Sequence, residues 1–464
     1  MALEVVILAA GKGSRMHSDL PKVLHKVAGM PMLGHVLNTA ISLKPEAVHV
    51  VVGHGAALVN AYLDKFDNKG IKVDCVEQTE QLGTAHAVKQ ALPLLNPNNN
   101  VIVLYGDTPL TPANILLKLV EKLGNSPLAV LSAITKNPFG YGRIVRNESG
   151  SLLKIVEEKD ADNSIRSICE INTGIIAAKA QTFLDYLPKI QNNNVQKEFY
   201  LTDLAGLLAQ EGKKVIVETA EDFELLSGIN SKKQLAFVER LFQKRSALRL
   251  MDEGVSFADP DRFDLRGTLE HGKDDFIDIN VIIEGHVVLG NNVTLGAGCV
   301  IRDCTIADGA VISPYTVMEE SSLGEETTVG PFSRLRPGSK LDKLAHVGNF
   351  VEIKKSHLSE GTKAGHLTYL GDAEIGKEVN IGAGTITCNY DGANKFKTII
   401  GDDVFVGSDS QLVAPVNIPA GVTIAAGTTV THRSDLKPQC LVLTRAQTIV
   451  KENYKRPHKN KPEK

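Results

Sequence analysis

Residues 323–353 read LGEETTVGPFSRLRPGSKLDKLAHVGNFVEI, and an aliphatic residue occupies every sixth position of this stretch. The spacing returns near the C-terminus, and the full set is Leu323, Val329, Leu335, Leu341, Val347, Ile353, Ile400, Val406, Leu412, Ile418, Ile424 and Val430. Six is not a helical period, whereas hexapeptide repeats are typical of a parallel β-helix, in which each repeat forms one wall of a triangular coil. We expect these side chains to stack inside the coil at a spacing of about 4.8 Å.

Two features modify this repeat. Glycine often follows the aliphatic residue, as at Gly324 and Gly407, and we interpret it as relieving a corner of the coil. The segment CNYDGANKFKTI, residues 388–399, does not fit the six-residue register without placing a charged or amide group inside the coil. We therefore predict that it loops outward, where solenoids often bind ligands.

The N-terminal half has a different texture. Up to about residue 228, amphipathic stretches alternate with the short apolar runs EVVILAA, AVHVVVG, VIVLYGD, LAVLSAI, TGIIAAK and KVIVETA. This alternation predicts an α/β domain with a largely parallel, Rossmann-like sheet. A helix should follow, because Ser231 and Gln234 have capping-box spacing and Gly254 can end it. The expected domains are therefore 1–229, a linker helix at 230–253, a β-helix at 254–450 and a basic tail at 451–464.

Composition limits the class of function. A chain of 464 residues is too long for one ordinary core, and its net charge of −3 offers no basic surface for nucleic acid, which leaves small-molecule ligands as the expectation. The basic tail is expected to be solvated. The 6 cysteines form no CxxC motif, which suits a reducing cytoplasm. We find no apolar stretch of about 18 residues, so neither a leader nor a membrane insertion is expected.

The glycine-rich loop after the first apolar run points to phosphate. Met16 stands where a dinucleotide fingerprint needs a small residue, and the Gly-Lys-Ser/Thr of a P-loop is absent. What remains is a loop of exposed backbone N–H groups at residues 9–13, able to approach an anion closely and accompanied by Lys12 and Arg15.

Longer motifs carry a family resemblance. LAAGKGSRM with PKVL, EQLGTAHA, VLYGDTPL, GYGRI and EINTGI resemble a sugar-phosphate nucleotidyltransferase of the pyrophosphorylase family. RLRPG, AHVGNFVEIKK and the run from KAGHLTYLG to KTIIG resemble a left-handed β-helix acyltransferase. In this order, over nearly the whole chain, they resemble the bacterial bifunctional N-acetylglucosamine-1-phosphate uridyltransferase/glucosamine-1-phosphate N-acetyltransferase family.

The resemblance implies two reactions. Glucosamine 1-phosphate takes an acetyl group from acetyl-coenzyme A, and the product then takes a uridylyl group from UTP, with release of pyrophosphate and a need for Mg²⁺. The resulting UDP-N-acetylglucosamine feeds peptidoglycan and lipopolysaccharide precursors. The family also implies a cytoplasmic homotrimer in which neighbouring subunits share the acetyl-coenzyme A channel.

Uridylyl transfer must bring two anions together, so cations and a metal are required. Asp107 ends the apolar run VIVLYGD, where it can hold Mg²⁺ or, with equal weight on sequence alone, cap a turn. The resemblance implies Asn230 as the second metal ligand and Arg15 and Lys22 as catalytic cations. It assigns uracil to Gln78, Gly83 and Thr84, the sugar to Gly142, Glu157 and Asn172, and further nucleotide contacts to Leu8, Ala9, Ala10, Gly11, Tyr105 and Gly106. Ala85 departs from the common glycine after LGT, with little expected effect.

Acetyl transfer to an amine needs a general base whose pKa is near neutral, which histidine provides. His366, within KAGHLTYLG, is our candidate. The resemblance implies that Arg336 and Lys354 grip the sugar phosphate, with Tyr369 and Asn380 as further sugar contacts. It implies an acetyl-coenzyme A channel lined by Ala383, Asn389, Tyr390, Ser408, Ala426 and Arg445.

Three alternatives stay open. Cys388 could form an acyl-enzyme, although no histidine adjoins it in the sequence and a thioester is already activated. The β-helix could serve assembly or regulation alone, which would leave the protein with one activity. His346, His357 and His366 could bind zinc, although their spacing on a coil of about eighteen residues argues against convergence on one point.

Overall fold

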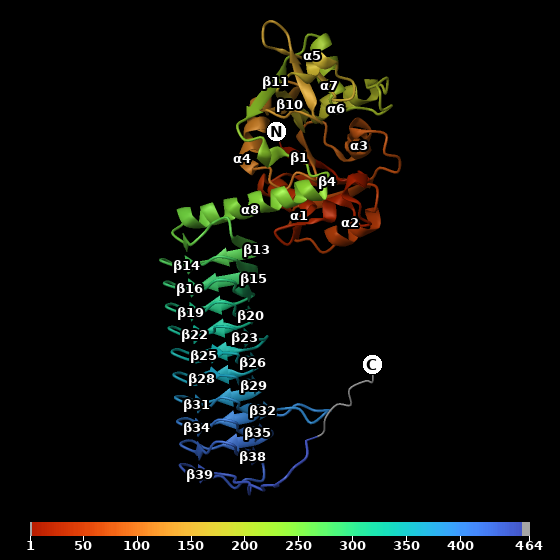
Figure 1. Cartoon of the computed structure of the whole chain (residues 1–464). Coiled ribbons are helices and arrows are strands. Elements are labelled where there is room, and N and C mark those ends of the chain that lie inside the picture. Colours follow the sequence, from red (N-terminus) through yellow and green to blue (C-terminus); the bar gives the residue numbers. More distant parts are fainter. Residues whose placement is uncertain (1, 457–464) are drawn as a thin grey trace, which may run out of the picture. The chain divides into compact units, whose positions relative to one another are not determined.

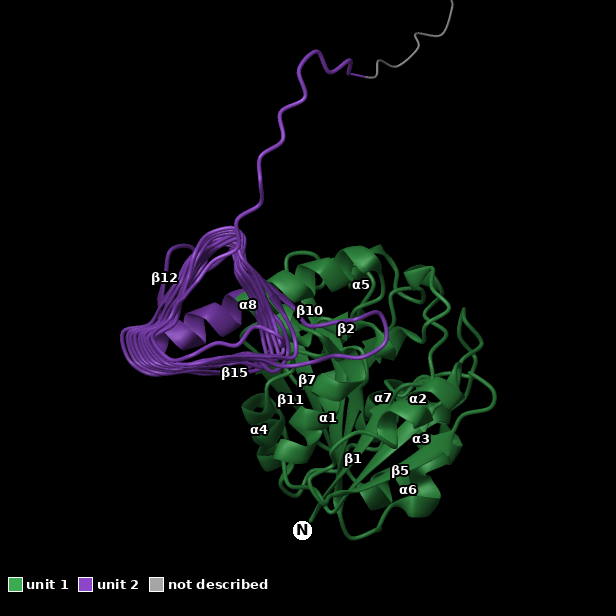
Figure 2. Cartoon of the chain, turned by 90° about the horizontal axis from the view of Figure 1, so that it is seen from below, with its two compact units in different colours: residues 1–243 green, residues 244–464 purple. Residues whose placement is uncertain are grey.

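The computed structural model describes residues 2–456 and divides the chain into two compact units, Met1–Gln243 and Lys244–Lys464 (Figures 1 and 2). The basic tail predicted at 451–464 therefore lies partly outside the described residues, from 457 onward. Within residues 2–456, no helix combines the length and apolar character that crossing a membrane requires.

Unit 1 is built on a 9-stranded mixed sheet. Its main path runs β11 (Val215–Ala220), β7 (Leu128–Ile134), β10 (Glu170–Lys179), β6 (Asn100–Tyr105), β1 (Leu3–Leu8), β4 (Ala47–Val52) and β5 (Lys72–Glu77). Strand β10 is antiparallel to both of its neighbours on this path, and β8 (Gly142–Arg146) and β9 (Leu152–Val156) extend from it. The six apolar runs quoted from the sequence are all strands of this sheet, so the predicted α/β fold is confirmed.

Helices cover both faces of the sheet because the strands are apolar on both sides. Val5 and Ile7 of β1 belong to one buried cluster and Val6 to the other. The first cluster includes side chains of α1 (Met32–Ser42), α2 (Ala56–Leu63) and α4 (Ala113–Leu123); the second includes α3 (Thr84–Ala91), α6 (Ala180–Tyr186) and α7 (Asp203–Gln210). Shorter elements of unit 1 are η1 (Ser14–Met16), η2 (Lys22–Leu24), β2 (Lys26–Val27), β3 (Met30–Pro31), η3 (Leu92–Leu94), α5 (Asn163–Arg166), η4 (Leu187–Lys189) and η5 (Glu224–Leu226).

Helix α8 (Lys232–Asp252) begins and ends where the sequence predicts. The Ser231 hydroxyl accepts a hydrogen bond from the Gln234 N–H at 3.3 Å, and the Gln234 side chain accepts one from the Asn230 N–H at 2.8 Å. Gly254 follows the helix with a φ of +108°, which favours glycine. The capping interactions thus fix Asn230 at the start of a long helix.

Unit 2 is a parallel β-helix with a triangular cross-section, seen along its axis in Figure 2. One sheet contains β12 (Ser256–Phe257), β14 (Phe276–Ile277), β16 (Thr294–Leu295), β19 (Val311–Ile312), β22 (Thr328–Val329), β25 (His346–Asn349), β28 (Lys363–His366), β31 (Asn380–Ile381), β34 (Phe405–Val406), β37 (Thr423–Ile424) and β39 (Leu441–Val442).

The second sheet supplies the other walls of the coil. Its strands are β13 (Phe263–Glu270), β15 (Val281–Leu289), β17 (Val300–Arg302), β18 (Thr305–Ile306), β20 (Val317–Glu319), β21 (Ser322–Leu323), β23 (Arg334–Leu335), β24 (Lys340–Leu341), β26 (Glu352–Lys354), β27 (His357–Leu358), β29 (Tyr369–Gly371), β30 (Ala373–Ile375), β32 (Ile386–Cys388), β33 (Thr398–Ile400), β35 (Gln411–Val413), β36 (Val416–Ile418) and β38 (Thr429–Thr431).

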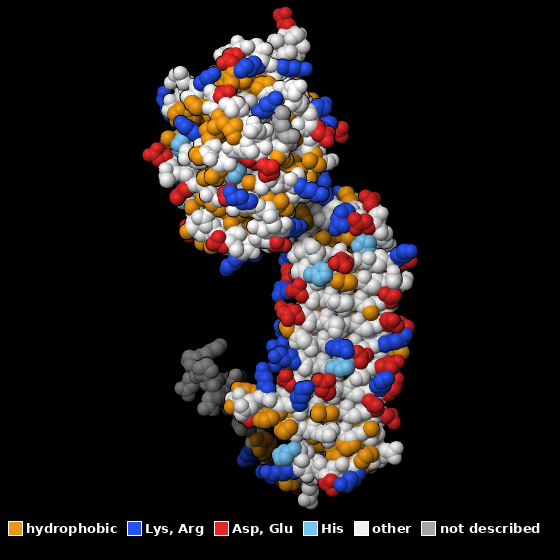
Figure 3. Space-filling view, turned by 180° about the vertical axis from the view of Figure 1, so that it is seen from behind, with side chains coloured by type: hydrophobic (Ala, Val, Ile, Leu, Met, Phe, Trp, Pro, Cys, Tyr) orange, Lys and Arg blue, Asp and Glu red, His pale blue; other side chains and the backbone are white. Residues whose placement is uncertain are grey.

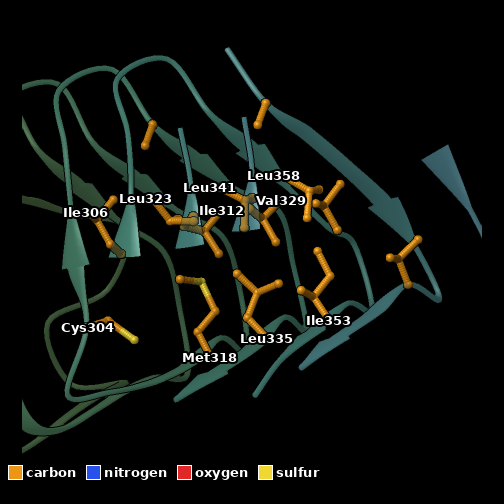
Figure 4. Packing of buried hydrophobic residues seen from close by; sticks show 14 of the residues in the cluster. Cys304, Ile306, Ile312, Met318, Leu323, Val329, Leu335, Leu341, Ile353 and Leu358 are labelled. Atoms are coloured by element: carbon orange, nitrogen blue, oxygen red, sulfur yellow. The ribbon is translucent and has the colours of Figure 1, made fainter. Parts of the chain in front are cut away.

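Aliphatic side chains stack in rows inside the coil, as Figure 4 shows. Every aliphatic position predicted from the hexapeptide period is buried, with at most 3 % of its surface exposed. Partners in successive coils are separated by three full hexapeptides, as in the pair Thr328 and His346, or by one position fewer, as in the pair Thr294 and Val311. The predicted β-helix is therefore confirmed.

Gly330, which follows Val329, lies in the left-handed region with a φ of +103°, but Gly324 and Gly407 have a different role from the corner relief expected. Gly324 and Gly407 do not lie in the left-handed region; instead, a Cβ there would lie 2.6 or 2.4 Å from a backbone nitrogen of the next coil. Left-handed corner positions fall on other residues, including Tyr315, Phe332 and Phe350. Close stacking of coils, and not the corner, excludes a side chain at these glycines.

The predicted outward loop is also confirmed. One coil runs from Lys363 to its partner Asn380, and the next runs from Asn380 to its partner Phe405. The second of these coils is clearly the longer. Its additional residues lie between β32 and β33, at residues 389–397, and project from the coil (Figure 1). We call this segment the excursion loop.

Candidate active sites

A hollow of about 610 Å³ opens in unit 1 where β1, β5 and β6 end. Parallel strands bring their carboxyl ends to the same edge, where open α/β sheets bind ligands. Of the residues predicted for the nucleotide site, those that line the hollow are Leu8, Ala9, Ala10, Gly11, Lys22, Gln78, Gly83, Thr84, Tyr105, Asp107 and Asn230.

Lys22 joins the two predicted metal ligands. Its Nζ donates hydrogen bonds to Asp107 Oδ2 and, at 3.0 Å, to Asn230 Oδ1, although Lys22 and Asn230 lie at opposite ends of unit 1 in the sequence. The Asp107 carboxylate therefore faces a cation inside the hollow instead of capping a turn. Two hard oxygen donors directed at one positive group are the arrangement that a divalent cation would use.

Gln78 lies at the opposite, buried part of the lining and is only 3 % exposed. Its Nε2 donates hydrogen bonds to the Gly83 carbonyl and to His86 Nδ1, each at 3.1 Å. Gly83 itself has a φ of +113°, and a Cβ there would lie 2.5 Å from the Phe199 carbonyl oxygen, so only glycine fits this position. The loop before α3 is thereby held in one shape.

The residues predicted to hold the sugar lie together beside this hollow. Gly142 of β8 pairs with Asn172 of β10, and a Cβ at Gly142 would lie 3.4 Å from the Glu157 carboxylate. Glu157 accepts a hydrogen bond from Thr202 at 2.9 Å and lines a second hollow of about 560 Å³ together with Asp203. Burial raises the pKa of Glu157. Burial, followed by the nearby Asp160 carboxylate, raises the pKa of Asp203 to about 6.

Besides the sugar residues, two predicted residues, Arg15 and Gly106, stand apart from the lining. Arg15 lies on η1 with an exposed side chain, and Gly106 follows Tyr105, with Val23 packed against it. Conversely, Tyr141, Thr173 and Glu198 line the hollow and were not predicted. Tyr141 belongs to the quoted motif GYGRI, which could have indicated it. Burial raises the pKa of both Tyr105 and Tyr141, so their hydroxyls stay neutral.

In unit 2, the predicted coenzyme site forms a line along the coil. The register pairs Ala364 with Ile381, Ile381 with Val406, and Val406 with Ile424. The residues two positions after these, one in each successive coil, are His366, Ala383, Ser408 and Ala426. Arg445 extends the line, because its Nη1 donates to the Ala426 carbonyl at 3.3 Å. Along this line, a histidine is thus followed by three small side chains.

His366 is exposed at the end of β28, and its Nδ1 lies 3.1 Å from Asn349 Oδ1 in the preceding coil. An amide oxygen only accepts, so Nδ1 carries the proton and Nε2 keeps a free lone pair. Cys388, the alternative nucleophile, is half-buried, and burial raises the pKa of its thiol. This disfavours the reactive thiolate.

A polar cluster lies beside the excursion loop. Lys354 Nζ is 3.9 Å from Asp372 Oδ2, which accepts a hydrogen bond from Asn389 Nδ2, and the neighbouring Lys354 ammonium lowers the pKa of Lys395. Lys395 was not predicted, because only the fold of the loop returns it to Lys354.

Tyr369 lies at the edge of this cluster, because its hydroxyl and Asn389 Nδ2 both approach the Cβ position of Gly371. Arg336 pairs with Glu352 at 2.9 Å, and Asn380 lies on β31. Tyr390 is exposed on the excursion loop and donates to the Gly392 carbonyl.

The three histidines considered for zinc have separate partners. His346 contacts Thr328, and His357 lies on another wall, where it pairs with Asp342 at 2.8 Å. His366 faces Asn349. They do not converge on one point, which a shared metal would require.

Comparisons with known proteins cover both units. Residues 5–177 match the MobA-like NTP transferase domain, and residues 397–432 match the hexapeptide repeat of succinyl-transferase. Two curated relatives, each named bifunctional protein GlmU, come from the F1 and KT2440 strains of Pseudomonas putida. Each is 50% identical over 461 residues, which is 99% of this chain and 100% of the relative. A crystal structure of HddC from Yersinia pseudotuberculosis is 21% identical, covers 48% of this chain and 91% of its own, and has a TM-score of 0.38.

Proposed function

The chain belongs to the family of the bifunctional protein GlmU, and from this premise we propose that each unit holds one of its transfer centres. It is a nucleotidyltransferase and an acetyltransferase of UDP-N-acetylglucosamine synthesis, which supplies cell-wall precursors. We assign uridylyl transfer to residues 1–229, acetyl transfer to residues 254–450 and a linking role to the helix at 230–253.

The observation that carries the first assignment is the meeting of Lys22, Asp107 and Asn230 in the unit 1 hollow. In the proposed reaction, a phosphate oxygen of N-acetylglucosamine 1-phosphate attacks the α-phosphorus of UTP, and pyrophosphate leaves. Backbone N–H groups of residues 9–13 hold phosphate oxygens, while Lys22 and Arg15 offset the charge that accumulates during the attack.

The residues present fit the divalent metal that nucleotidyl transfer in this family requires. A carboxylate and an amide oxygen that already share one cation form the hard donor set Mg²⁺ prefers. We assign Mg²⁺ to Asp107 and Asn230, where it would neutralise phosphate charge. Lys22 must then leave its present position and turn to the phosphates.

Recognition in unit 1 is divided between the hollow and the group of residues beside it. Gln78, Gly83 and Thr84 hold uracil, and Gly142, Glu157 and Asn172 hold the N-acetylglucosamine. The grouping of the last three around one point supports this division.

For acetyl transfer, His366 acts as the general base. Its Nε2 takes a proton from the ammonium group of glucosamine 1-phosphate, and the free amine attacks the thioester carbonyl of acetyl-coenzyme A. The new C–N bond forms and the C–S bond breaks, and the second proton lost by the attacking nitrogen passes to the departing thiolate, so that coenzyme A leaves as the thiol. Asn349 supports this role because it holds the proton on Nδ1. Arg336, Lys354 and Lys395 bind the sugar phosphate, and the line from Ala383 to Arg445 holds the coenzyme.

A trimer is the proposed assembly. Tyr315, Phe332, Phe350 and Leu367 occupy the same corner of successive coils and expose between 51% and 61% of their surfaces. The first three rings stack with centroids 5.2 and 5.6 Å apart. This row, the corner ladder, adjoins His366, so a second copy seated on it would border the coenzyme line. Acidic and basic side chains are interspersed on the face seen in Figure 3, whereas the ladder is apolar. The six free cysteines support a cytoplasmic location.

One assay of the full-length protein tests both assignments. Pyrophosphate release should require UTP, N-acetylglucosamine 1-phosphate and Mg²⁺ together, and coenzyme A release should require acetyl-coenzyme A and glucosamine 1-phosphate. Unchanged acetyl transfer in a His366→Ala variant would instead favour a β-helix that serves assembly alone.

A further inference from the structure

The imidazole of His86 lies between two glutamine side chains at the start of α3. Its Nδ1 is 3.1 Å from Gln78 Nε2, and its Nε2 is 3.1 Å from Gln90 Nε2. His86 and Gln90 are one helical turn apart on α3, whereas Gln78 belongs to the loop after β5. The histidine therefore connects a rigid helix to a residue that lines the unit 1 hollow.

This contact bears on the orientation of the Gln78 amide. A primary amide has two N–H donors, and those of Gln78 are directed to the Gly83 carbonyl and to His86 Nδ1. The amide oxygen of this buried side chain is then left for a ligand in the hollow. Turning the amide over would place its oxygen against the Gly83 carbonyl, which is an unfavourable pair of acceptors.

The tautomer of His86 follows from the same geometry. A neutral imidazole carries one proton, so Nδ1 can accept from Gln78 only when Nε2 holds it. The Gly83 carbonyl favours the same orientation, because it also accepts from Gln78 Nε2, and the buried Gln78 has little room to move away from either acceptor. Gln90 Nε2 also donates to the His86 carbonyl at 3.0 Å, but Gln90 is less buried than Gln78, so its side chain can leave that contact and accept from Nε2–H through its oxygen.

We propose that His86 is a positioning residue that, together with the Gly83 carbonyl, holds the Gln78 amide oxygen toward the hollow and so sets the preference for uracil over cytosine. The proposal rests on the proposed function, in which Gln78 contacts the base. Uracil presents an N3–H donor that the amide oxygen accepts, whereas cytosine presents an unprotonated N3 that the same oxygen repels. A freely turning amide would serve both bases.

The test is the ratio of kcat/KM for UTP to kcat/KM for CTP, measured on the full-length protein with N-acetylglucosamine 1-phosphate and Mg²⁺. We expect His86→Leu to lower the ratio about tenfold or more, while the KM for N-acetylglucosamine 1-phosphate stays unchanged. His86→Asn should retain most of the ratio, because its amide oxygen can replace Nδ1. His86→Gln should behave like His86→Leu, because its amide replaces Nε2. Gln90→Ala is the matched control and should leave the ratio unchanged.

The ratio does not depend on how much enzyme is folded, so the Asn and Gln variants decide the matter even if the Leu variant is unstable. Equal ratios in His86→Asn, His86→Gln and the unchanged protein would overturn the role of His86. Gln78→Ala separates the two proposals. If it leaves the ratio unchanged, Gln78 does not read the base and the proposed function fails there. If it lowers the ratio and His86→Leu does not, only the inference about His86 fails.

Discussion

The two units place functional groups together in opposite ways. In unit 1, Lys22, Asp107 and Asn230 come from three distant segments: Lys22 begins η2, Asp107 follows β6, and Asn230 precedes α8. In unit 2, His366, Ala383, Ser408 and Ala426 are neighbours because the coil repeats. Adjacency in the first unit depends on topology, and in the second it depends on the stacking of successive coils. Substitutions that act on one unit and spare the other sharpen this contrast.

His366→Ala should have the largest effect. Loss of a general base lowers a rate by about 10²–10⁴-fold, and we expect acetyl transfer to fall in that range with uridylyl transfer unchanged. Coenzyme A release and pyrophosphate release, measured on the same sample, give both numbers. His357→Ala is the control, because His357 pairs with Asp342 on another wall. Equal losses in the two variants would show that His366 has no special role.

Asp107→Asn tests the other unit. The substitution keeps the size of the side chain and removes the charge, so uridylyl transfer should fall by about 10²-fold, a typical cost of losing one electrostatic partner of the transition state. Acetyl transfer is the internal reference and should not change. Asp67→Asn, at an exposed loop position, controls for charge. Uridylyl transfer within tenfold of the original rate would contradict the metal-site assignment.

Gly324→Ala probes the close stacking of coils. The added Cβ would lie 2.6 Å from the Lys343 backbone nitrogen, so the coils must separate locally, at a cost of about 1–3 kcal/mol in the free energy of unfolding. Gly365→Ala is the matched control, because nothing lies within 4 Å of its Cβ position. Denaturant titrations followed by circular dichroism compare the variants. Similar midpoints for both would mean that coil spacing tolerates side chains at these glycines.

Asp203→Asn should give the smallest effect. The pKa of Asp203 is raised to about 6, so its ionised carboxylate lowers the free energy of unfolding at high pH. This penalty disappears as the pH falls through 6 toward the ordinary pKa of an aspartate. Because the group is partly solvated, we expect the variant to be more stable by only about 1 kcal/mol at pH 8 and equal near pH 4. Melting temperatures across this range provide the measurement. A pH-independent difference would exclude protonation as its cause.

The same contrast explains which features the sequence could predict. The interior rows of unit 2 follow from periodicity, because an aliphatic residue at each wall must point inward. The slight shortening of some coils could not be read in advance, since a corner loses a residue without disturbing the aliphatic pattern. In unit 1, no spacing rule brings Lys22 to Asn230; the motif resemblance did so. Lys395 and His86 were missed because each acts through a contact between segments.

The excursion loop has an evolutionary consequence. The coil resumes its register after residue 397, so the additional residues leave the stacking below them unchanged. The length of such a loop affects stability mainly through closure entropy, which grows slowly. Changes in its length or composition can therefore occur with little effect on the packing of the solenoid.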